Sequence, residues 1–553
     1  MKSSKKESET MKYTKKLQIL VLVVILAMTL TACSSSGDPK KPAAATAVKD
    51  TLVYAIPISP AGVFHPTLQY SNYDRRVVFL VYDRLLTKGA DGAYIPSLAD
   101  KYEVSKDGLT YTFTLKKGIK WHDGQEFTAE DVAFTYETTC HPKFGKGYDE
   151  FSMMLLGADA YHAGKADRVE GVKVIDKYTV SFTFTKPYNA ALVKFIDKPV
   201  LAKHVWGKVP VEKWNDETAL LKNPIGTGPY KFVEFKPDQY VKLESNKDYF
   251  KGAPQIKNFI FKVSNADTQQ SELLNGTIDI AAIASWKEGD LKPYTTAGIK
   301  IDELPGSTAE YLIFNTTDPR FADKRVRQAI IYAIDRDALV ASILNKHGLI
   351  SNTIMHPSQY GYPSDLNPYK QDFAKAKALL KDAGWVDSNN DGILDKDGKP
   401  FKVTLQHYDD ASAPVASALQ QYLKQVGIDV EITKKDFNTV LATLQNKTKD
   451  QKFDLAFMGA SYRANIGYGA SNFWMARYDD ATSKALIQAG SEAASEALAK
   501  PIYQKWARYI NEEVPMFILF FEPDGTAYNP ALLNYKPVMY EWFPDVEKWT
   551  FKK

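Results

Sequence analysis

The second half of the chain alternates helical and strand patterns, and this alternation constrains the fold most strongly. Apolar residues recur at helical spacing from Asp323 to Leu344, which predicts one long helix. The segments 428–432 and 453–458 have the short apolar pattern of strands. Asp372 predicts the start of another helix and Gly384 predicts its end. Helices that alternate with strands indicate an α/β lobe.

The first half carries short strands separated by turns. Residues 111–115 alternate apolar side chains with threonine, which is the period of a half-buried strand, and residues 180–184 repeat this pattern. Thr128 lies three residues before Asp131, and this spacing predicts a capped helix start. Because 553 residues exceed the size of one simple core, we expect two or three domains.

The N-terminus has the pattern of a processing signal. Residues 12–16 are rich in lysine, and residues 19–28 form an unbroken apolar run that is shorter than the roughly 20 residues of a bilayer span. The run is followed by Leu-Thr-Ala-Cys at 30–33, which resembles the lipobox of bacterial lipoproteins. The resemblance implies that the chain is cut before Cys33 and that the Cys33 thiol carries lipid. A plain secretory signal with a chance cysteine is the alternative, and Met11 is an alternative start.

The predicted signal peptide, residues 1–32, carries the net charge of the chain. It holds six lysines and two glutamates, a net charge of +4, and the whole chain is also +4. The mature chain is therefore formally neutral, and a nucleic-acid partner has no electrostatic support. Residues 33–50 lack large apolar side chains and read as a flexible tether. Cys140 is then the second and last cysteine, and we expect it to be a buried small apolar residue.

Motifs of catalysis and of cofactor binding are absent from the sequence. The eight histidines are scattered, and there is no HExxH, GxSxG, phosphate-loop or dinucleotide-binding pattern. We therefore predict that the protein is not an enzyme and needs no cofactor. A hydrolase with a pair of catalytic carboxylates remains the open enzyme alternative, because any two of the 66 acidic residues could meet in space.

One segment, DSNNDGILDKDG at 387–398, resembles a calcium-binding EF-hand loop. Asp387, Asp391 and Asp395 stand at ligand positions, but Gly398 occupies the twelfth position, where a bidentate glutamate belongs. A strand pattern rather than a helix follows the segment. We expect a turn rich in Asp, Asn and Gly, with calcium binding as the alternative.

Seven blocks of the sequence, in order, resemble the solute-binding proteins of family 5, which include the oligopeptide- and dipeptide-binding subunits of bacterial ABC importers. They include IPSLADKYEV with the run that follows it, GTGPY, LLNGTIDIA, LKDAGW and FDLAFMG. The blocks are residues 95–136, 223–250, 273–281, 311–340, 380–385, 422–432 and 453–459. The resemblance covers nearly all of residues 51–550.

The resemblance implies an α/β type II periplasmic-binding-protein fold, with two lobes, a hinge and an extra domain inserted in the first lobe. By this reading, lobe I comprises residues 51–82, 208–310 and 522–553, the inserted domain comprises 83–207, and lobe II comprises 311–521. It also implies a function. The protein would be a monomer that captures peptides in a cleft between the lobes, outside the membrane. It would then deliver them to the membrane permease of an ABC importer. A nickel chelate, a saccharide or a small anion is the alternative solute.

The resemblance and the high aromatic content together predict residues that bind the ligand. They are Phe64, His65, Tyr70, Tyr360, Tyr362, Gly459, Ala460, Ser461, Tyr462, Arg463 and Trp474. Other readings stay open: His65 as a turn residue, and the two tyrosines of 355–363 as packed side chains of a surface loop.

Arg463 is unexpected. The resemblance implies that an aspartate close to this position meets the amino group of a bound peptide, yet no acidic residue lies between Leu455 and Tyr478. A guanidinium would repel an ammonium group and prefers carboxylate or phosphate. We therefore predict that the protein does not hold a peptide N-terminus in the family's usual way. The amino group then binds elsewhere, or the solute is anionic; alternatively, Arg463 points outward or pairs with an acid of its own lobe.

Overall fold

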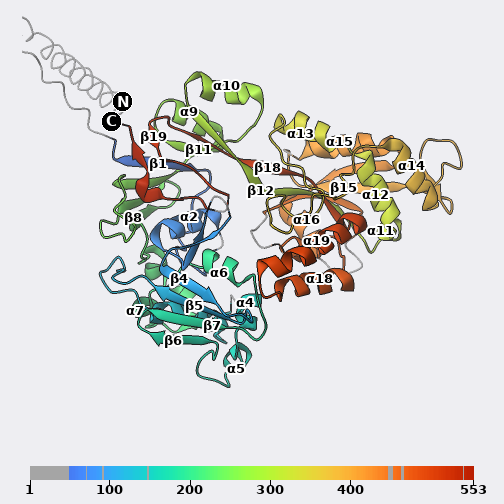
Figure 1. Ribbon diagram of the computed structural model, residues 1–553. Coiled ribbons are helices and arrows are strands. Elements are labelled where there is room, and N and C mark those ends of the chain that lie inside the picture. Colours follow the sequence, from blue (N-terminus) through green and yellow to red (C-terminus); the bar gives the residue numbers. More distant parts are fainter. Residues whose placement is uncertain are drawn as a thin grey trace, which may run out of the picture. The chain divides into compact units, whose positions relative to one another are not determined.

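A ten-stranded sheet runs through the computed structural model, which describes residues 49–69, 71–89, 92–145, 148–410, 412–445, 452–461, 466, 468–539 and 541–552. The strand order is β16-β15-β17-β12-β18-β11-β1-β10-β9-β8 (Figure 1). The bounds are β1 Thr51–Ile56, β8 Tyr230–Lys236, β9 Tyr240–Ser245, β10 Asn258–Val263, β11 Ile280–Ala282, β12 Lys300–Phe314, β15 Lys402–His407, β16 Asp429–Lys434, β17 Leu455–Ser461 and β18 Met516–Tyr528.

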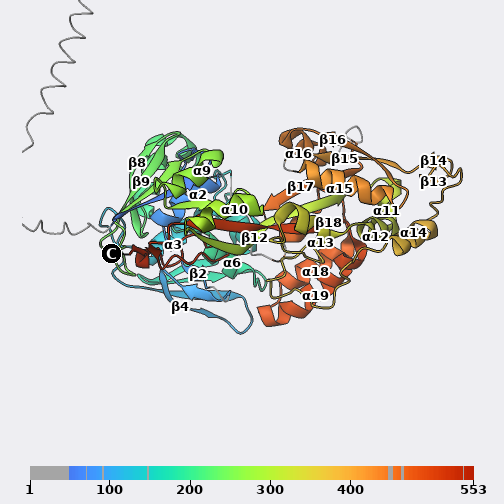
Figure 2. The ribbon, with the colours of Figure 1, turned by 90° about the horizontal axis from the view of Figure 1, so that it is seen from above.

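Two long strands of this sheet, β12 and β18, join the two lobes. They pair antiparallel from Lys300 opposite Tyr528 to Ile313 opposite Met516. β18 also pairs with β11 at its carboxyl end, whereas β12 pairs with β17 at its own carboxyl end. Figure 2 shows both strands running from the side of β8 and β9 to the side of β15 and β17. The predicted lobe boundaries at 310/311 and 521/522 fall inside these strands, as expected of a hinge.

Short helices and the antiparallel pair of β19 and β20 near the C-terminus complete lobe I. Strand β1 pairs in parallel with β10 along its whole length. The remaining elements of these segments are α2 Asn72–Val81, η1 Val211–Asp216, α8 Thr218–Lys222, α9 Ala266–Leu274, α10 Glu288–Thr296, β19 Leu532–Leu533, η2 Val546–Lys548 and β20 Thr550–Phe551.

Residues 83–207 form a four-stranded antiparallel sheet with helices beside it. The order is β4-β5-β7-β6. Helix α3 starts with the predicted capping box, in which Asp131 accepts a hydrogen bond from Thr128 N at 2.9 Å, and it ends at the fully buried Cys140. The elements are β2 Leu86–Lys88, β3 Tyr94–Pro96, β4 Ala99–Val104, β5 Thr110–Leu115, α3 Ala129–Cys140, α4 Glu150–Met154, α5 Ala158–His162, β6 Val172–Asp176, β7 Thr179–Thr183, α6 Ala191–Asp197 and α7 Lys203–Trp206.

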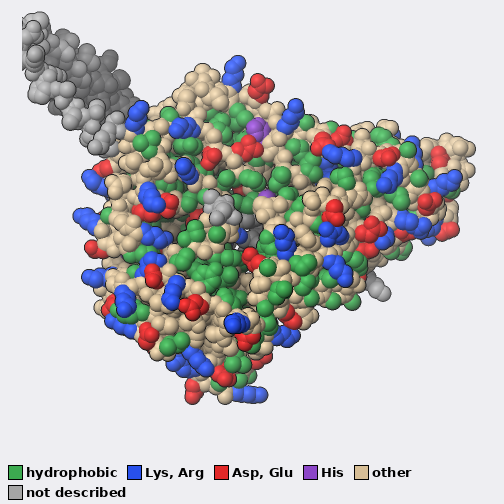
Figure 3. Space-filling model, in the orientation of Figure 1, with side chains coloured by type: hydrophobic (Ala, Val, Ile, Leu, Met, Phe, Trp, Pro, Cys, Tyr) green, Lys and Arg blue, Asp and Glu red, His purple; other side chains and the backbone are tan. Residues whose placement is uncertain are grey.

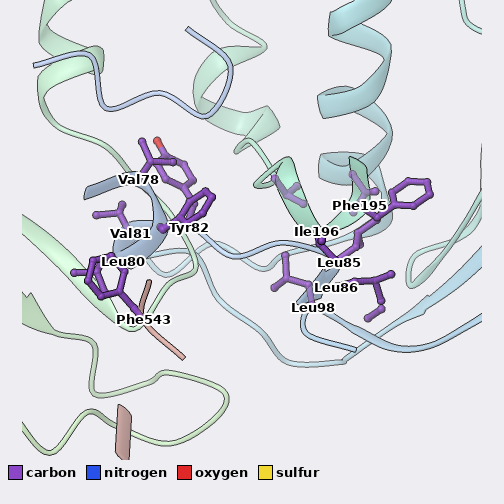
Figure 4. Packing of buried hydrophobic residues seen from close by; sticks show 14 of the residues in the cluster. Val78, Leu80, Val81, Tyr82, Leu85, Leu86, Leu98, Phe195, Ile196 and Phe543 are labelled. Atoms are coloured by element: carbon purple, nitrogen blue, oxygen red, sulfur yellow. The ribbon is translucent and has the colours of Figure 1, made fainter. Parts of the chain in front are cut away.

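One apolar core links this segment to lobe I. Val78, Val81 and Tyr82 of the first lobe belong to the same buried cluster as Leu85 and Phe195 (Figure 4). A shared core resists relative motion, because separating the two parts would expose apolar surface to water. We therefore expect residues 83–207 to move with lobe I as one body.

Lobe II has the alternating pattern that the sequence predicted, with one correction. The predicted helix 323–344 is two helices, because Ile334 and Asp335 are extended and Asp335 caps a new helix through a 2.9 Å hydrogen bond from Ala338 N. The elements other than strands of the large sheet are α11 Pro319–Ala322, α12 Lys324–Ala333, α13 Arg336–Leu344, α14 Phe373–Asp382, β13 Asp395–Lys396, β14 Lys399–Pro400, α15 Ala413–Lys424, α16 Phe437–Gln445, α17 Tyr468–Ser471, α18 Ala481–Ser491 and α19 Glu496–Glu513.

The segment that resembles a calcium loop is a turn followed by a hairpin. The Asp387 carboxylate accepts hydrogen bonds from Asp391 N and Gly392 N at 3.2 and 3.0 Å. The hairpin of β13 and β14 turns at Asp397 and Gly398, both with positive φ, as a tight hairpin turn requires. The acidic residues are therefore used as turn residues. Over the described ranges, no cluster of three His, Cys, Asp or Glu side chains suits a metal ion.

Nothing among the described helices combines the length and the apolar character that crossing a bilayer demands. On the face drawn in Figure 3, positive and negative side chains are interspersed. That face therefore carries no extended patch of one charge.

Candidate ligand-binding site

The carboxyl ends of the parallel strands in lobe II form the candidate site. β15 pairs in parallel with both β16 and β17, so the residues that follow β15 meet the end of β17. Those residues are Tyr408 and Asp409 on one side and Gly459–Ser461 on the other. In open α/β sheets, ligands bind outside the carboxyl ends of the strands, at the point where the strand order reverses.

Glu310 of β12 lies at this edge, directly opposite Gly459 of β17. A β-bulge separates Glu310 from Tyr311 in the pairing with β18, and bulges re-aim side chains next to binding sites. The carboxylate lies over Gly459 so closely that a Cβ built there would overlap Oε1 and lie 3.2 Å from Oε2. Only glycine at 459 leaves room for the carboxylate in this position.

The carboxylate of Glu310 is buried and lacks a partner. The side chain is 4% exposed, and its Oε2 atom accepts no hydrogen bond within the described part of the chain. Burial raises the pKa of Glu310 well above its ordinary value, and the nearby charges of Glu522 and Asp409 raise it further. Among the described residues, the charges that act on Glu310 are therefore both negative.

The neighbours of Glu310 come from two different elements. Asp409 follows β15 and accepts a 2.8 Å hydrogen bond from Ser412 N, which fixes its loop. Glu522 lies on β18 with a side chain that reaches the surface, and desolvation by its surroundings, followed by the charge of Asp409, raises its pKa. Tyr408 lies beside them, and burial followed by the charge of Glu310 raises the pKa of its phenol. The edge therefore concentrates negative charge next to the end of β17.

A cavity of about 1120 Å³ opens elsewhere in the cleft region, between α18 of lobe II and residues 150–186. Trp474 is 38% exposed and belongs to its wall, and its predicted contact with a ligand stays a prediction. The wall consists of Glu150, Met154, Lys186, Thr317, Leu444, Gln445, Ala470, Phe473, Trp474, Arg477, Tyr478, Asp479, Asp480, Ser483, Lys484, Ile487, Gln488, Ser491 and Glu492.

Direct bonds join the two sides of this cavity. Asn189 N donates to Ser491 O at 3.1 Å, and Asn189 Nδ2 donates to Gly490 O at 2.5 Å. The Lys186 ammonium also pairs with the Glu492 carboxylate at 3.0 Å. These bonds hold the carboxyl end of α18 against the segment after β7.

Phe64 and His65 lie in the core of lobe I instead of on a cleft surface. Phe64 is 1% exposed, and its ring packs against Phe232 and Phe235. His65 is fully buried and packs edge-on against Trp206; its Nδ1 accepts a hydrogen bond from Thr67 N at 3.1 Å. Burial lowers the pKa of His65 to about 3. This burial does not fit the predicted ligand contact, and it fits the alternative of a turn histidine.

The tyrosines of the 355–363 loop are used in packing. The Tyr360 ring lies 6.1 Å from the Tyr503 ring, and the Tyr362 hydroxyl accepts a 2.9 Å hydrogen bond from Asn352 N. Both are half-buried. These contacts fit the alternative of packed loop tyrosines and give no support to ligand contact.

The remaining predicted residues fall in or beside the end of β17. Ala460 is half-buried and pairs with Ala309, and the backbone of Ser461 pairs with Thr308. Cys33, Tyr70, Tyr462 and Arg463 lie outside the described residues, so their predicted roles stay predictions. Sequence reasoning missed Glu310, Asp409 and Glu522. One signal in the sequence could have identified Glu310, because it is the lone acidic residue of the apolar run Ala309–Phe314.

The two lobes share one mixed sheet, two strands cross between them, and the candidate binding edge lies at strand ends. These features define the class of two-lobed solute-binding proteins. The model of the bacterial extracellular solute-binding proteins, family 5 (middle region), matches residues 93–481. The chain belongs to this family, which confirms the resemblance found in the sequence.

Named relatives agree with this assignment. The chain is 29% identical over 566 residues to the oligopeptide-binding protein AppA of Bacillus subtilis (strain 168), an alignment that covers 97% of this chain and 99% of that protein. It is 30% identical over 445 residues to the dipeptide-binding protein of Escherichia coli (strain K12), which covers 75% of this chain and 77% of that one. The solved structure of AppA from B. subtilis in complex with a nonapeptide matches with a TM-score of 0.72 and 27% identity, over 92% of this chain and 99% of that one.

Proposed function

We propose that this protein captures peptides between its two lobes outside the membrane and delivers them to the permease of an ABC importer. The observation that carries the proposal is the near full-length similarity to relatives named for oligopeptide and dipeptide binding, one of which has a solved nonapeptide complex. The bound peptide leaves unchanged, so the protein acts as a carrier and not as an enzyme.

The carboxyl edge of lobe II suits a peptide backbone. Among the described residues, β17 pairs with β15 only at Leu455 and Ala456, so beyond Ala456 the main chain of β17 has no strand partner on that side. Main-chain groups bind any peptide sequence, while roomy pockets accept varied side chains. The cavity beside Trp474, about 1120 Å³, is larger than the roughly 300–1,000 Å³ of common small-molecule pockets and has room for several side chains.

The proposed location rests on the N-terminal sequence. Lipidation at Cys33 would hold the monomer on the extracytoplasmic side of the cell membrane, with residues 33–50 as a tether. The mass of the N-terminal peptide of the membrane-extracted protein tests this step. A diacylglyceryl group on Cys33 supports it, and a free thiol there overturns it.

Mass spectrometry of the co-purifying solute tests the function. The protein is extracted from cells that express the whole chain and is denatured, and the released small molecules are identified. Peptides of several residues, which rebind on titration and are recovered uncut, are the expected result. A metal chelate, a saccharide or a small anion alone would replace peptides as the solute. Shortened peptides would show an enzyme.

A further inference from the structure

Glu310 has a buried acceptor atom for which the described part of the chain supplies no hydrogen-bond partner. A buried polar atom nearly always has a hydrogen-bond partner, because burial without one costs the solvation that water gave it. Glu310 Oε2 has no such partner in the described part of the chain, although the side chain is 4% exposed. This atom, beside the carboxyl end of β17, is an acceptor that a ligand can satisfy.

The surroundings of Glu310 specify the charge of that ligand group. Asp409 and Glu522 act on Glu310 from the β15 loop and from β18, and both are acids. By contrast, Asp454, on the other side of lobe II, is paired with Arg320 at 2.5 Å. A buried carboxylate flanked by two more carboxylates favours a cation.

We propose that Glu310, flanked by Asp409 and Glu522, is the subsite for a primary ammonium group of the ligand. The proposal rests on the proposed function, because peptides supply such a group from the N-terminus or from a lysine side chain. It deepens that function by naming a positioning contact for the amino group on β12, rather than in the segment around β17 where the family resemblance would place it.

Ammonium fits the geometry better than a guanidinium does. An ammonium group is compact and has three donors that point in different directions, whereas a guanidinium needs a carboxylate that offers both oxygens in one plane. At Glu310, Oε1 lies against the Gly459 backbone and Oε2 is the oxygen without a partner. One ammonium can donate to Oε2, and Glu522 of β18, which acts on Glu310 electrostatically, offers a second carboxylate near it.

The protonation of Glu310 gives the proposal a second consequence. Burial and the two acids raise the pKa of Glu310, so the empty site favours the neutral acid. An arriving ammonium stabilises the carboxylate, and the proton of Glu310 then leaves to solvent while the ligand keeps its charge. Tyr408, Asp409 and Glu522 are the titratable groups that face it from the packed elements. Binding therefore releases protons.

A set of matched peptide pools tests the subsite. The first is a pool of random pentapeptides without lysine, the second is the same pool after N-acetylation, and the third is an N-acetylated pool with one lysine per peptide. Each is equilibrated with the full chain, and bound peptide is measured by ultrafiltration and mass spectrometry. The wild-type protein is expected to retain the first pool about tenfold or more above the second, the size of one charged hydrogen bond.

The variants decide whether Glu310 causes this preference. Glu310→Gln keeps the shape and removes the charge, and it is expected to reduce the ratio between the first two pools to about one. Glu303→Gln changes an exposed acid on the same strand and is the matched control, with the ratio retained. An unchanged ratio in Glu310→Gln overturns the subsite. If the third pool matches the first, the lysine side chain is a source of the ammonium group; if it matches the second, only the N-terminus is.

Calorimetry of the first pool in two buffers of different ionisation enthalpy measures the protons. Wild-type binding is expected to release protons at neutral pH, and Glu310→Gln is expected to lose that release. Equal release in both proteins also overturns the subsite. If the wild-type protein retains none of the three pools, the proposed peptide function fails, and the subsite fails with it. Peptide binding without preference for a free amino group refutes the subsite alone.

Discussion

Two kinds of buried charge occur in lobe II and in the strands that join it to lobe I, and their difference separates scaffold from site. Arg327 is 3% exposed, and carbonyl oxygens meet its guanidinium on all sides: Nε donates to Val514 O at 3.0 Å and Nη1 donates to Phe321 O at 2.6 Å. Arg336 is held in the same way, by Ser351 O at 2.5 Å and Pro368 O at 2.7 Å. Glu310 is buried as deeply, yet one of its oxygens is left without a partner.

The two arginines tie segments far apart in the chain to one another. Nη2 and Nε of Arg327 both donate to Glu513 O, which joins α12 to the end of α19. Burial lowers the pKa of Arg336 to about 10, which still leaves it charged at neutral pH. A guanidinium that donates to several carbonyl oxygens stabilises the fold, whereas the open acceptor of Glu310, beside the end of β17, is available to a ligand.

Removing the satisfied arginine has the largest expected effect on stability. Arg327→Ala leaves several buried carbonyls without donors and is expected to lower the free energy of unfolding by about 3–5 kcal/mol. Urea denaturation followed by circular dichroism measures the change. Arg325→Ala, on the exposed side of the same helix, is the control and should leave the midpoint nearly unchanged. If Arg327→Ala lowered the free energy of unfolding less than Arg325→Ala does, the buried carbonyls would have found other donors.

Filling the space at Gly459 is expected to damage the site more than the fold. Gly459→Val pushes the Glu310 carboxylate away, because even a Cβ overlaps its Oε1 atom. We expect destabilisation of about 1–3 kcal/mol and loss of most peptide binding. Gly289→Val, at a glycine of α10 that has open space around it and lies outside the site, is the control in the same titration. Full peptide binding by Gly459→Val would show that the binding site does not include the end of β17.

Neutralising Glu310 is expected to stabilise the empty protein. Below the ordinary glutamate pKa of 4.5 the group is protonated in both the folded and the unfolded state. As pH rises above that value, the unfolded chain loses the proton and the folded chain keeps it, so the free energy of unfolding falls. Glu310→Gln removes this fall and should raise stability at neutral pH by on the order of 1 kcal/mol. Denaturation curves at pH 4 and pH 7 measure it, and equal pH dependence in both proteins would contradict the burial of an unpaired acid.

Loosening the contact between α18 and the segment after β7 is expected to have the smallest effect. Asn189→Ala removes donors to Gly490 O and Ala493 O and should change peptide affinity by a few-fold, about 1 kcal/mol or less. Lys186→Ala removes only the exposed ion pair with Glu492 and serves as control. A larger loss of peptide affinity in Lys186→Ala than in Asn189→Ala would contradict this expectation.

The sequence predicted the regular elements well, because their patterns are local. β5 begins one residue before its predicted range of 111–115 and ends where that range ends, and the capping box of α3 is present. The break between α12 and α13 was missed, because the apolar face continues through Ile334 while Asp335 ends the helix by capping the next one.

The site was predicted less well than the fold. The segment around Phe64 and His65 has the composition of a binding loop, but both side chains are packed in the core. Their burial depends on residues distant in the sequence, such as Phe232 and Trp206. Glu310 becomes informative only when β12, β17 and β18 are paired, because its neighbours come from β18 and the loop after β15. Strand pairing over such separations is not encoded in any local pattern.

A crystal structure of the protein with a bound peptide tests the account most directly. The account predicts a peptide along the carboxyl ends of β15 and β17, with an ammonium nitrogen within about 3 Å of Glu310 Oε2. A peptide bound only in the cavity beside Trp474, with Oε2 still lacking a partner, would contradict it.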